Sequence, residues 1–340
     1  MLGFELLGMG LGTDVKTCDR VKSSQLDERL GLPQGTVEAQ SGVQERWVLK
    51  SGISQSAFAA YALKACAQNA TVALDTVDLL MATAAVPQQA IPNTASLIAH
   101  ELGLSGMATL DINASCLGFV VSLYQAMALL QTGAYQRIAL VASDRASAGL
   151  NWQHLHASAI FGDGAVGVII QRPDGSLSQK SGAGVRFSCL AFASETYPEG
   201  SALCEVRAGG TRVNPQVGMR DSDFFFDMDG KGIFKLAMQH TERFTDTLLR
   251  QAGLDYRDID CVIMHQASHL GMKHAISRLK FRPETIVNIY AHHGNQVSAS
   301  IPTALYHAYQ QGILKPNTKL ALLGTAAGFS IGGMILEVVP

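Results

Sequence analysis

The chain has 340 residues, of which 47% are hydrophobic and only 16% charged, a balance typical of a compact folded protein and unlike that of a disordered one. Its formal net charge of −2 gives no electrostatic reason to expect nucleic acid or an anionic membrane as the main partner. The cysteines are scattered without CxxC pairs or Cys/His ligand spacing, which argues against a metal site and against a disulfide scaffold.

The N-terminus gives no sign of a targeting segment. Residues 1–12 are apolar but lack a basic leader and a cleavage site, so they predict a first strand that ends in glycines. No run in the sequence is long enough to span a bilayer. We therefore expect a cytoplasmic protein with reduced thiols.

The first half predicts alternating helices and strands. An alanine-rich helix is expected at residues 55–74, a buried strand at 77–83 and a helix at 94–102, from propensity and apolar spacing. A strand-like run then breaks over small residues at 111–119, and a helix follows from Cys116 to about Gln131. Further strands are predicted at 138–143 and 166–170, the latter behind the glycine-rich turn 161–165.

Cys116 draws attention because the pattern puts it in the first turn of a helix. A thiol there faces unpaired backbone N–H groups and the positive end of the helix dipole, which predicts a lowered pKa and donors for an oxyanion. A single cysteine in apolar surroundings is nevertheless more often inert core. The assignment of Cys116 as a nucleophile therefore needs support from other parts of the chain.

The second half repeats the plan of the first, after connecting loops and strands at residues 171–221 and a helix at 233–252. The strand at 258–265 overlays 76–83, which pairs His265 with Thr83 at an offset of 182 (265 − 83). The helix at 304–312 overlays 125–133 at an offset of 179 (312 − 133), which places Asn295 opposite Cys116. We expect two α/β halves, residues 1–170 and 222–340, with these side chains facing one another.

A cysteine, a histidine and an asparagine suffice for carbon–carbon bond formation on thioesters. The thiolate takes an acyl group, while the histidine and the neutral amide hold the carbonyl of a malonyl-type thioester as carbon dioxide leaves. Taken singly, His265 is more readily a satisfied core histidine, and Asn295 is as readily a turn or capping residue. Only the three together favour a catalytic site.

Five motifs, in order, resemble those of β-ketoacyl-acyl-carrier-protein synthase III and its thiolase-fold relatives. They lie at residues 111–119, 161–165, 265–267, 294–302 and 328–330, and residues 41–46 resemble the family's Thr-Gly-Ile-Arg-Glu-Arg segment. The resemblance implies a thiolase-like five-layer αβαβα fold of two pseudo-symmetric halves, and a likeness to enzymes that are usually homodimers. It also implies acyl-CoA or acyl-carrier-protein thioesters as substrates, acyl carrier protein as a partner, and no bound cofactor or metal.

The same resemblance assigns roles to individual residues. Cys116 would accept the acyl group, and His265 and Asn295 would serve decarboxylation and condensation. The oxyanion hole would consist of the backbone N–H groups of Cys116 and Ala327. The family position whose aromatic side chain from the partner subunit shortens the acyl pocket falls near Ile91, which predicts a pocket that admits more than acetyl.

Some positions depart from the family pattern. Ala326-Ala327-Gly328 stands where the family commonly has three glycines, which a backbone donor tolerates if φ is negative. The tryptophan and arginine that clamp the coenzyme A adenine are missing, with Gln40 at the arginine position and no tryptophan before Trp47. A further set of basic side chains could meet a substrate phosphate or simply belong to a solvated loop: His269, Lys273, His292 and His293.

The leading hypothesis is a decarboxylative condensing enzyme that makes a fatty acid or a specialised acyl product. A non-decarboxylating acyltransferase to an alcohol or amine is the alternative, although it has no need of Asn295. A third possibility is a catalytically inactive subunit that supports a partner, which the intact Cys116, His265 and Asn295 disfavour.

Overall fold

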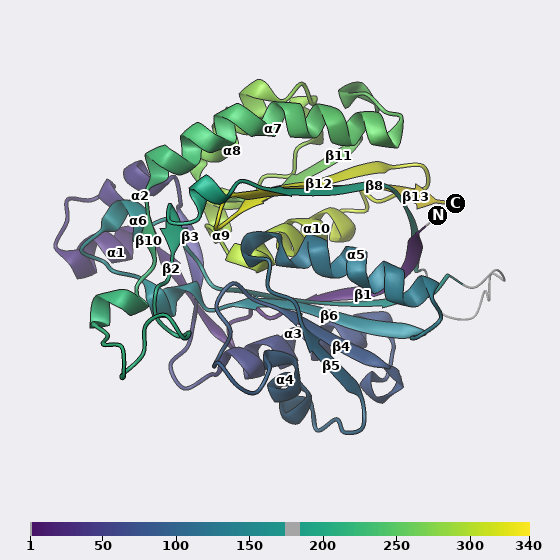
Figure 1. Ribbon diagram of the computed structural model, residues 1–340, viewed down its shortest axis with the longest axis horizontal. Coiled ribbons are helices and arrows are strands. Elements are labelled where there is room, and N and C mark those ends of the chain that lie inside the picture. The colour runs from purple at the N-terminus through teal and green to yellow at the C-terminus, as the bar shows by residue number, and fades with distance from the viewer. Residues whose placement is uncertain (1, 174–183) are drawn as a thin grey trace.

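The computed structural model describes residues 2–173 and 184–340. Its described strands form a nine-stranded sheet in the order β11-β12-β13-β8-β1-β7-β6-β4-β5 and two two-stranded sheets, β2-β3 and β9-β10. β1 and β8 are antiparallel neighbours through Gly3–Leu6 and Val185–Ser188, and this pairing joins two halves that otherwise separate into two stacked sheets (Figure 1). Of the connecting segment predicted at residues 171–221, residues 174–183 lie outside the described part of the chain.

The elements follow one another in a regular order within each half. The first half contains β1 (Gly3–Leu11), β2 (Cys18–Lys22), α1 (Ser23–Leu30), α2 (Thr36–Ser41), β3 (Glu45–Leu49), α3 (Gln55–Ala70), β4 (Leu79–Thr83), α4 (Thr94–Leu102), β5 (Ala108–Asp111), α5 (Gly118–Gln131), β6 (Arg137–Asp144), α6 (Leu155–Ser158) and β7 (Gly164–Gln171). The second contains β8 (Val185–Thr196), β9 (Cys204–Glu205), β10 (Asp227–Met228), α7 (Gly230–Ala252), β11 (Cys261–Met264), α8 (His269–Arg278), α9 (Tyr290–His293), α10 (Ser300–Gln310), β12 (Lys319–Ala326) and β13 (Ser330–Val339).

These elements stack in five layers, as the resemblance predicted. Figure 1 shows α7 and α8 outside one sheet, α3 and α4 outside the other, and α5 and α10 between the two. The alternation of side chains along the strands explains the layering. In β6, Ile138 and Leu140 belong to the core around α5 and α10, whereas Ala139 and Val141 belong to the core around α3 and α4.

The internal repeat is visible in the hydrogen bonds of the two sheets. Asp78, at the start of β4, donates its N–H to the carbonyl of Arg137 and accepts the N–H of Arg137 on its carboxylate, both at 2.9 Å. Asp260, before β11, exchanges the same two bonds with Lys319 at 2.9 and 3.0 Å. Both pairs are related by an offset of 182 (260 − 78; 319 − 137), so the predicted duplication of the sheet is confirmed.

The offset of 179 predicted for the central helices is wrong at their starts. α5 (Gly118–Gln131) begins 182 residues before α10 (Ser300–Gln310) but ends 179 residues before it. The difference arises because α10 has 11 residues and α5 has 14. Alignment on the helix ends therefore shifted every residue before the helices by three positions.

The pairing of Cys116 with Asn295 is corrected accordingly. At an offset of 182, Asn295 corresponds to Asn113 and Cys116 corresponds to Ser298. The hydrogen bonds agree: the side-chain oxygen of Asn113 accepts the N–H two residues ahead at 2.9 Å, and that of Asn295 does the same at 2.9 Å. Cys116 and Asn295 thus come from equivalent turns but not from equivalent positions.

Most element boundaries agree with the sequence predictions to within a few residues, and α4 agrees at both ends. β8 is an interior strand between β1 and β13, in the connecting segment where strands were expected without stated bounds. No helix in the described part of the chain is long and apolar enough to cross a bilayer.

Candidate active site

Cys116 lies in a strained turn between β5 and α5. The short 3₁₀ turn Ser115–Leu117 precedes the helix, and Ser115 has a positive φ of 49°, a conformation that costs a non-glycine residue about 1–3 kcal/mol and is common at functional sites. The Asn113 side chain stabilises the turn by accepting the Ser115 N–H. α5 then starts with Gly118, where a Cβ would come within 1.9 Å of the Thr83 hydroxyl oxygen.

The pKa of the Cys116 thiol is raised, contrary to the sequence-based prediction. Burial is the main cause, followed by electrostatic effects of Cys204 and Asp144. The backbone N–H groups of Ala327 and of Cys116 itself act in the opposite direction, as the helix-start argument expected, but they do not outweigh burial. The thiol is therefore protonated at rest and needs a base to become a nucleophile.

His265 is placed directly after β11 and is buried. Burial lowers its pKa to about 4, so the imidazole is neutral at neutral pH and free to accept a proton. Its backbone N–H bonds to the carbonyl of Leu323 at 2.8 Å, and Gly324 lies against its Cβ, where a Cβ on Gly324 would come within 3.2 Å. Among the described residues the His265 Nδ1 has no hydrogen-bond partner.

The motif at residues 161–165 holds Asn295 in place. The backbone N–H of Asn295 bonds to the carbonyl of Ile160 at 2.7 Å, and its carbonyl accepts the N–H of Gly162 at 3.1 Å. Gly162 has no room for a side chain, since a Cβ would lie 2.3 Å from the carbonyl oxygen of His293. The motif is thus structural, and it ties the first half to the Asn295 turn.

The orientation of the Asn295 amide is fixed by its neighbours. Its oxygen accepts the N–H of Val297 at 2.9 Å, and its nitrogen donates to the carbonyl of Ala267 at 3.1 Å. An amide nitrogen carries two hydrogens, so one N–H remains available after the bond to Ala267. Val297, with φ 54°, is a β-branched residue in a conformation it rarely adopts, which repeats the strain seen at Ser115.

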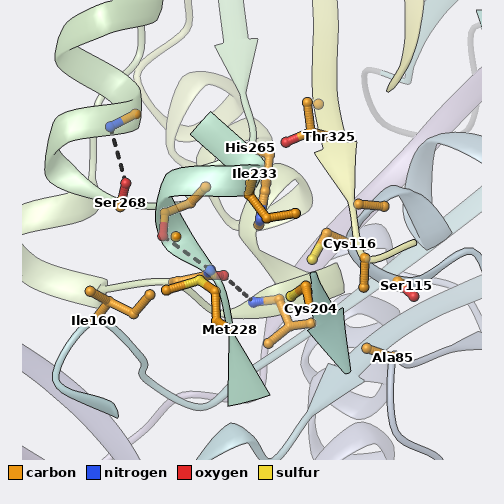
Figure 2. A pocket seen from close by; sticks show the side chains of 18 of the residues that line it. Ala85, Ser115, Cys116, Ile160, Cys204, Met228, Ile233, His265, Ser268 and Thr325 are labelled. Atoms are coloured by element: carbon orange, nitrogen blue, oxygen red, sulfur yellow. Dashed lines mark hydrogen bonds between the residues drawn. The ribbon is translucent and has the colours of Figure 1, made fainter. Parts of the chain in front are cut away.

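One cleft of about 1930 Å³ brings the predicted residues together. Cys116, His265, Asn295 and Ala327 all line it, and Figure 2 shows Cys116 and His265 at its wall with Ile233 nearby. The positions that depart from the family pattern, the basic side chains considered with them and Ile91 do not all line this cleft. Gln40, His269 and Lys273 line the cleft, whereas Trp47, Ile91, His292 and His293 are not among its lining residues.

Ile91 is therefore not brought to the site of its own chain. Its side chain is 84% exposed, while the preceding loop residues 85–90 line the cleft. This placement leaves its predicted role, which involves a partner subunit, as a prediction.

The backbone donor at Ala327 avoids the positive φ that would require glycine. Ala326 and Ala327 are not among the residues with positive φ, which falls instead on Gly328 at 77° and on Phe329 at 41°. The N–H groups of Ala327 and Cys116 both act on the Cys116 sulfur. They are thus available at the position where an oxyanion on an acyl-cysteine would form.

The sequence analysis missed Asp144, which lies at the end of β6 and lines the cleft. Its carboxylate accepts the N–H of Ala85 at 2.9 Å and both the N–H, at 2.9 Å, and the hydroxyl of Ser298. Burial raises its pKa to about 6. A carboxylate at the carboxyl end of a buried strand was the available signal, and Asp144 positions a cleft loop and the turn of the other half.

Comparisons with known proteins agree with this architecture. The family model for 3-oxoacyl-(acyl-carrier-protein) synthase III matches residues 110–184, and the model for the C-terminal part of that family matches residues 249–338. A beta-ketoacyl-(acyl-carrier-protein) synthase III of Nitratidesulfovibrio vulgaris is 31% identical over 307 residues, which cover 88% of this chain and 89% of the relative. Synthase III 3 of Streptomyces coelicolor is 29% identical over 318 residues, or 93% and 92% of the two chains.

Solved structures show the same fold. The crystal structure of 3-oxoacyl-(acyl carrier protein) synthase III, FabH, from Pseudomonas aeruginosa has a TM-score of 0.84 at 25% identity, with 100% of each chain covered. OleA of Xanthomonas campestris has a TM-score of 0.82 at 19% identity over 98% of each chain, a likeness of fold alone. Fold and cleft together define a thiolase-fold condensing enzyme. More narrowly, the chain belongs to the β-ketoacyl-(acyl-carrier-protein) synthase III family.

Proposed function

We propose that the protein accepts an acyl group on Cys116 and condenses it, with loss of carbon dioxide, with a malonyl thioester. The donor and acceptor are thioesters of coenzyme A or of acyl carrier protein, and acyl carrier protein is a partner. No bound cofactor or metal takes part in the reaction as proposed.

Acylation begins with proton transfer, because the buried Cys116 thiol is protonated at rest. Neutral His265 accepts that proton, and the thiolate attacks the acyl carbonyl. The backbone N–H groups of Cys116 and Ala327 stabilise the oxyanion of the tetrahedral intermediate. The bond from the acyl carbon to the donor sulfur then breaks, and the departing thiolate takes the proton from His265.

Condensation uses the same cleft a second time. The remaining N–H of Asn295 and an N–H of His265 bind the thioester carbonyl of the malonyl group. When the bond to the carboxylate breaks, carbon dioxide leaves and its electron pair forms an enolate, whose negative oxygen these donors stabilise. The enolate carbon attacks the acyl carbon on Cys116, the bond from that carbon to the Cys116 sulfur breaks, and the released thiolate takes a proton from water.

The observation that carries this proposal is the fixed amide of Asn295. Simple acyl transfer needs a nucleophile and a base, which Cys116 and His265 supply. An amide held by Val297 and Ala267 inside the cleft, with one N–H left over, can in addition stabilise a second carbonyl that acquires negative charge.

The deciding experiment supplies acyl thioesters together with malonyl thioester labelled in its free carboxylate. Intact mass identifies the acyl group on the protein, and released labelled carbon dioxide reports decarboxylation. We expect acyl groups longer than acetyl on Cys116 and release that depends on them. Acyl-enzyme without any release would indicate the alternative, a non-decarboxylating acyltransferase, and acetyl alone on Cys116 would refute the longer pocket.

We further propose that the protein works as a cytoplasmic homodimer. β5 is an edge strand of the sheet, and Leu110 on it is 40% exposed; an uncovered apolar edge of this kind is suited to pairing with a second chain. Ile91, fully on the outside of its own chain, would then be placed to reach the partner's pocket. Analytical ultracentrifugation tests this assembly, and a monomer at micromolar concentration would contradict it.

A further inference from the structure

A second thiol shares the cleft with Cys116. Cys204 lies on β9, which pairs with β10 through Cys204 and Met228. It lines the same cleft as Cys116, and Figure 2 shows the two side chains beside each other, with Met228 on the far side of Cys204. Both cysteines are free and half-buried.

The two thiols also interact electrostatically. Among the ionisable groups that raise the pKa of the Cys116 thiol, Cys204 has the largest effect, ahead of the buried carboxylate of Asp144. Because Coulomb interactions weaken with distance, this effect agrees with the neighbouring positions of the two side chains in Figure 2.

The other four cysteines lack this arrangement. Cys18, Cys66 and Cys261 are buried in the core, and the Cys66 thiol donates to the carbonyl of Gly8. Cys189 on β8 is half-buried like Cys204 but interacts with the carbonyl of Ala191. Of the six cysteines, only Cys116 and Cys204 line the cleft.

We propose that Cys116 and Cys204 are a peroxide-responsive thiol pair that closes reversibly into a disulfide. Neutral His265 takes the proton of the Cys116 thiol, and the thiolate attacks one oxygen of hydrogen peroxide. The O–O bond breaks to give a sulfenic acid and hydroxide, which takes the proton back from His265 and leaves as water. The Cys204 thiol then displaces the hydroxyl as a second water, and the S–S bond forms. In sum, two thiols are oxidised and one peroxide is reduced to two waters.

Formation of the bond depends on the segment that carries Cys204. A disulfide needs its Cα atoms within about 4.4–6.8 Å of each other, and Cys204 is on a two-stranded ribbon whose strands have two residues each. This short ribbon is flanked by the exposed residues 209–212 and 215–222, and the Glu205 carboxylate next to Cys204 pairs with Arg212 of that exposed segment. The disulfide would also protect Cys116 from irreversible oxidation to the sulfinic and sulfonic acids.

The effect on activity rests on the proposed function of Cys116, but the disulfide does not. Because the bond occupies the sulfur that would carry the acyl group, we expect oxidised protein to lose acylation and to regain it with dithiothreitol. Intact mass and peptide mapping detect the bond whether or not the protein condenses thioesters, so the two proposals fail separately.

The test treats the purified protein with hydrogen peroxide, alkylates free thiols and maps peptides without reduction. We expect a loss of two hydrogens and a linked pair of peptides that contain Cys116 and Cys204. In Cys204→Ser the link is absent and Cys116 proceeds to the sulfinic acid, whereas Cys189→Ser, the matched half-buried control, behaves as wild type. Equal over-oxidation of Cys116 in wild type and Cys204→Ser, with no linked peptide, would overturn the proposal.

Discussion

The turn before α5 and the turn before α10 share their backbone and their hydrogen bonds. In each, an asparagine oxygen accepts the N–H two residues ahead, the asparagine nitrogen donates to a carbonyl 28 residues earlier, and the next residue but one has positive φ. The environments differ. Asn113 is exposed, whereas Asn295 is 6% exposed and lines the cleft.

The residues three positions further on differ as well. Cys116 lines the cleft, while its counterpart Ser298 is fully buried and donates its hydroxyl to Asp144. The same scaffold therefore occurs twice, and its chemistry depends on which side chain of each copy faces the cleft. The first copy supplies the thiol and the second supplies the amide. A variant in one turn can therefore be compared with the variant at the equivalent position in the other turn.

The largest difference is expected between Cys116→Ala and Ser298→Ala. Without the thiol no acyl-enzyme forms, and we expect condensation to fall by roughly a thousandfold or more. Ser298→Ala keeps acylation and loses stability by about 1.5–3 kcal/mol, the range for a hydrogen bond to a charged group. Intact mass after incubation with acyl thioester, together with urea denaturation, measures both. Acyl-enzyme in Cys116→Ala would move the nucleophile elsewhere.

Asn295→Ala and Asn113→Ala separate catalysis from turn structure. Both variants lose the same two hydrogen bonds, but only Asn295 presents an N–H to the cleft. We expect carbon dioxide release to fall about 10²–10³-fold in Asn295→Ala, as for the loss of one oxyanion donor, while acylation persists. Equal release from the two variants would assign Asn295 to structure alone.

Gly118→Ala tests why the two helices start with different residues. The new Cβ would come within 1.9 Å of the Thr83 hydroxyl oxygen, and we expect a loss of about 1–3 kcal/mol in the free energy of unfolding. In the second half the equivalent Ser300 is useful, because its hydroxyl accepts the N–H of Gln266 at 2.9 Å. Gly210→Ala, which meets no atom within 4 Å, is the control, and an equal loss there would refute the steric reason.

The smallest effect concerns the buried histidines of the second half. Burial lowers the pKa of His265 to about 4, and burial together with His307, His292 and Arg20 lowers that of His293 to about 3. In the unfolded chain both histidines have the ordinary pKa of 6.5. Their full contribution to the free energy of unfolding is therefore present above pH 6.5 and is lost as the pH falls toward the folded-state pKa. Between pH 6.5 and 5 we expect a loss of about 1–2 kcal/mol for each histidine.

Urea denaturation at several pH values, on wild type and on His293→Gln, measures this effect. The variant should show the shallower fall over that range, since it lacks one of the two titrations. Parallel curves would show that His293 does not stay neutral in the folded protein.

Strong local patterns in the sequence predicted most of the fold. What they missed depends on contacts with segments that are distant in the chain. The helix at Thr94–Leu102 follows from an Asn93 cap and a Gly103 stop, which act locally. β8 is half exposed and mixed in composition, so its bounds follow from its pairing with β1 and β13 rather than from a periodic pattern. The raised pKa of Cys116 likewise depends on burial by distant segments, which a local helix-start argument does not include.

The site was predicted from the motifs of the resembled family rather than from hydrophobic periodicity or the internal repeat. His265, Asn295 and Ala327 reached the cleft as expected, but the repeat alone, read from helix ends, would have paired Cys116 with the wrong residue. Asp144 was missed because its role is visible only through its bonds to Ala85 and Ser298, residues far from it in the chain.

The position of β1 constrains how the chain can fold as it is made. β1 pairs with β7 on one side and with β8 on the other, and Gly3 is opposite Ser188. β1 therefore has no neighbouring strand to pair with until the chain has been made as far as β7 (Gly164–Gln171). Pairings so distant in sequence form slowly, and an apolar strand that waits for them is exposed to association with other chains.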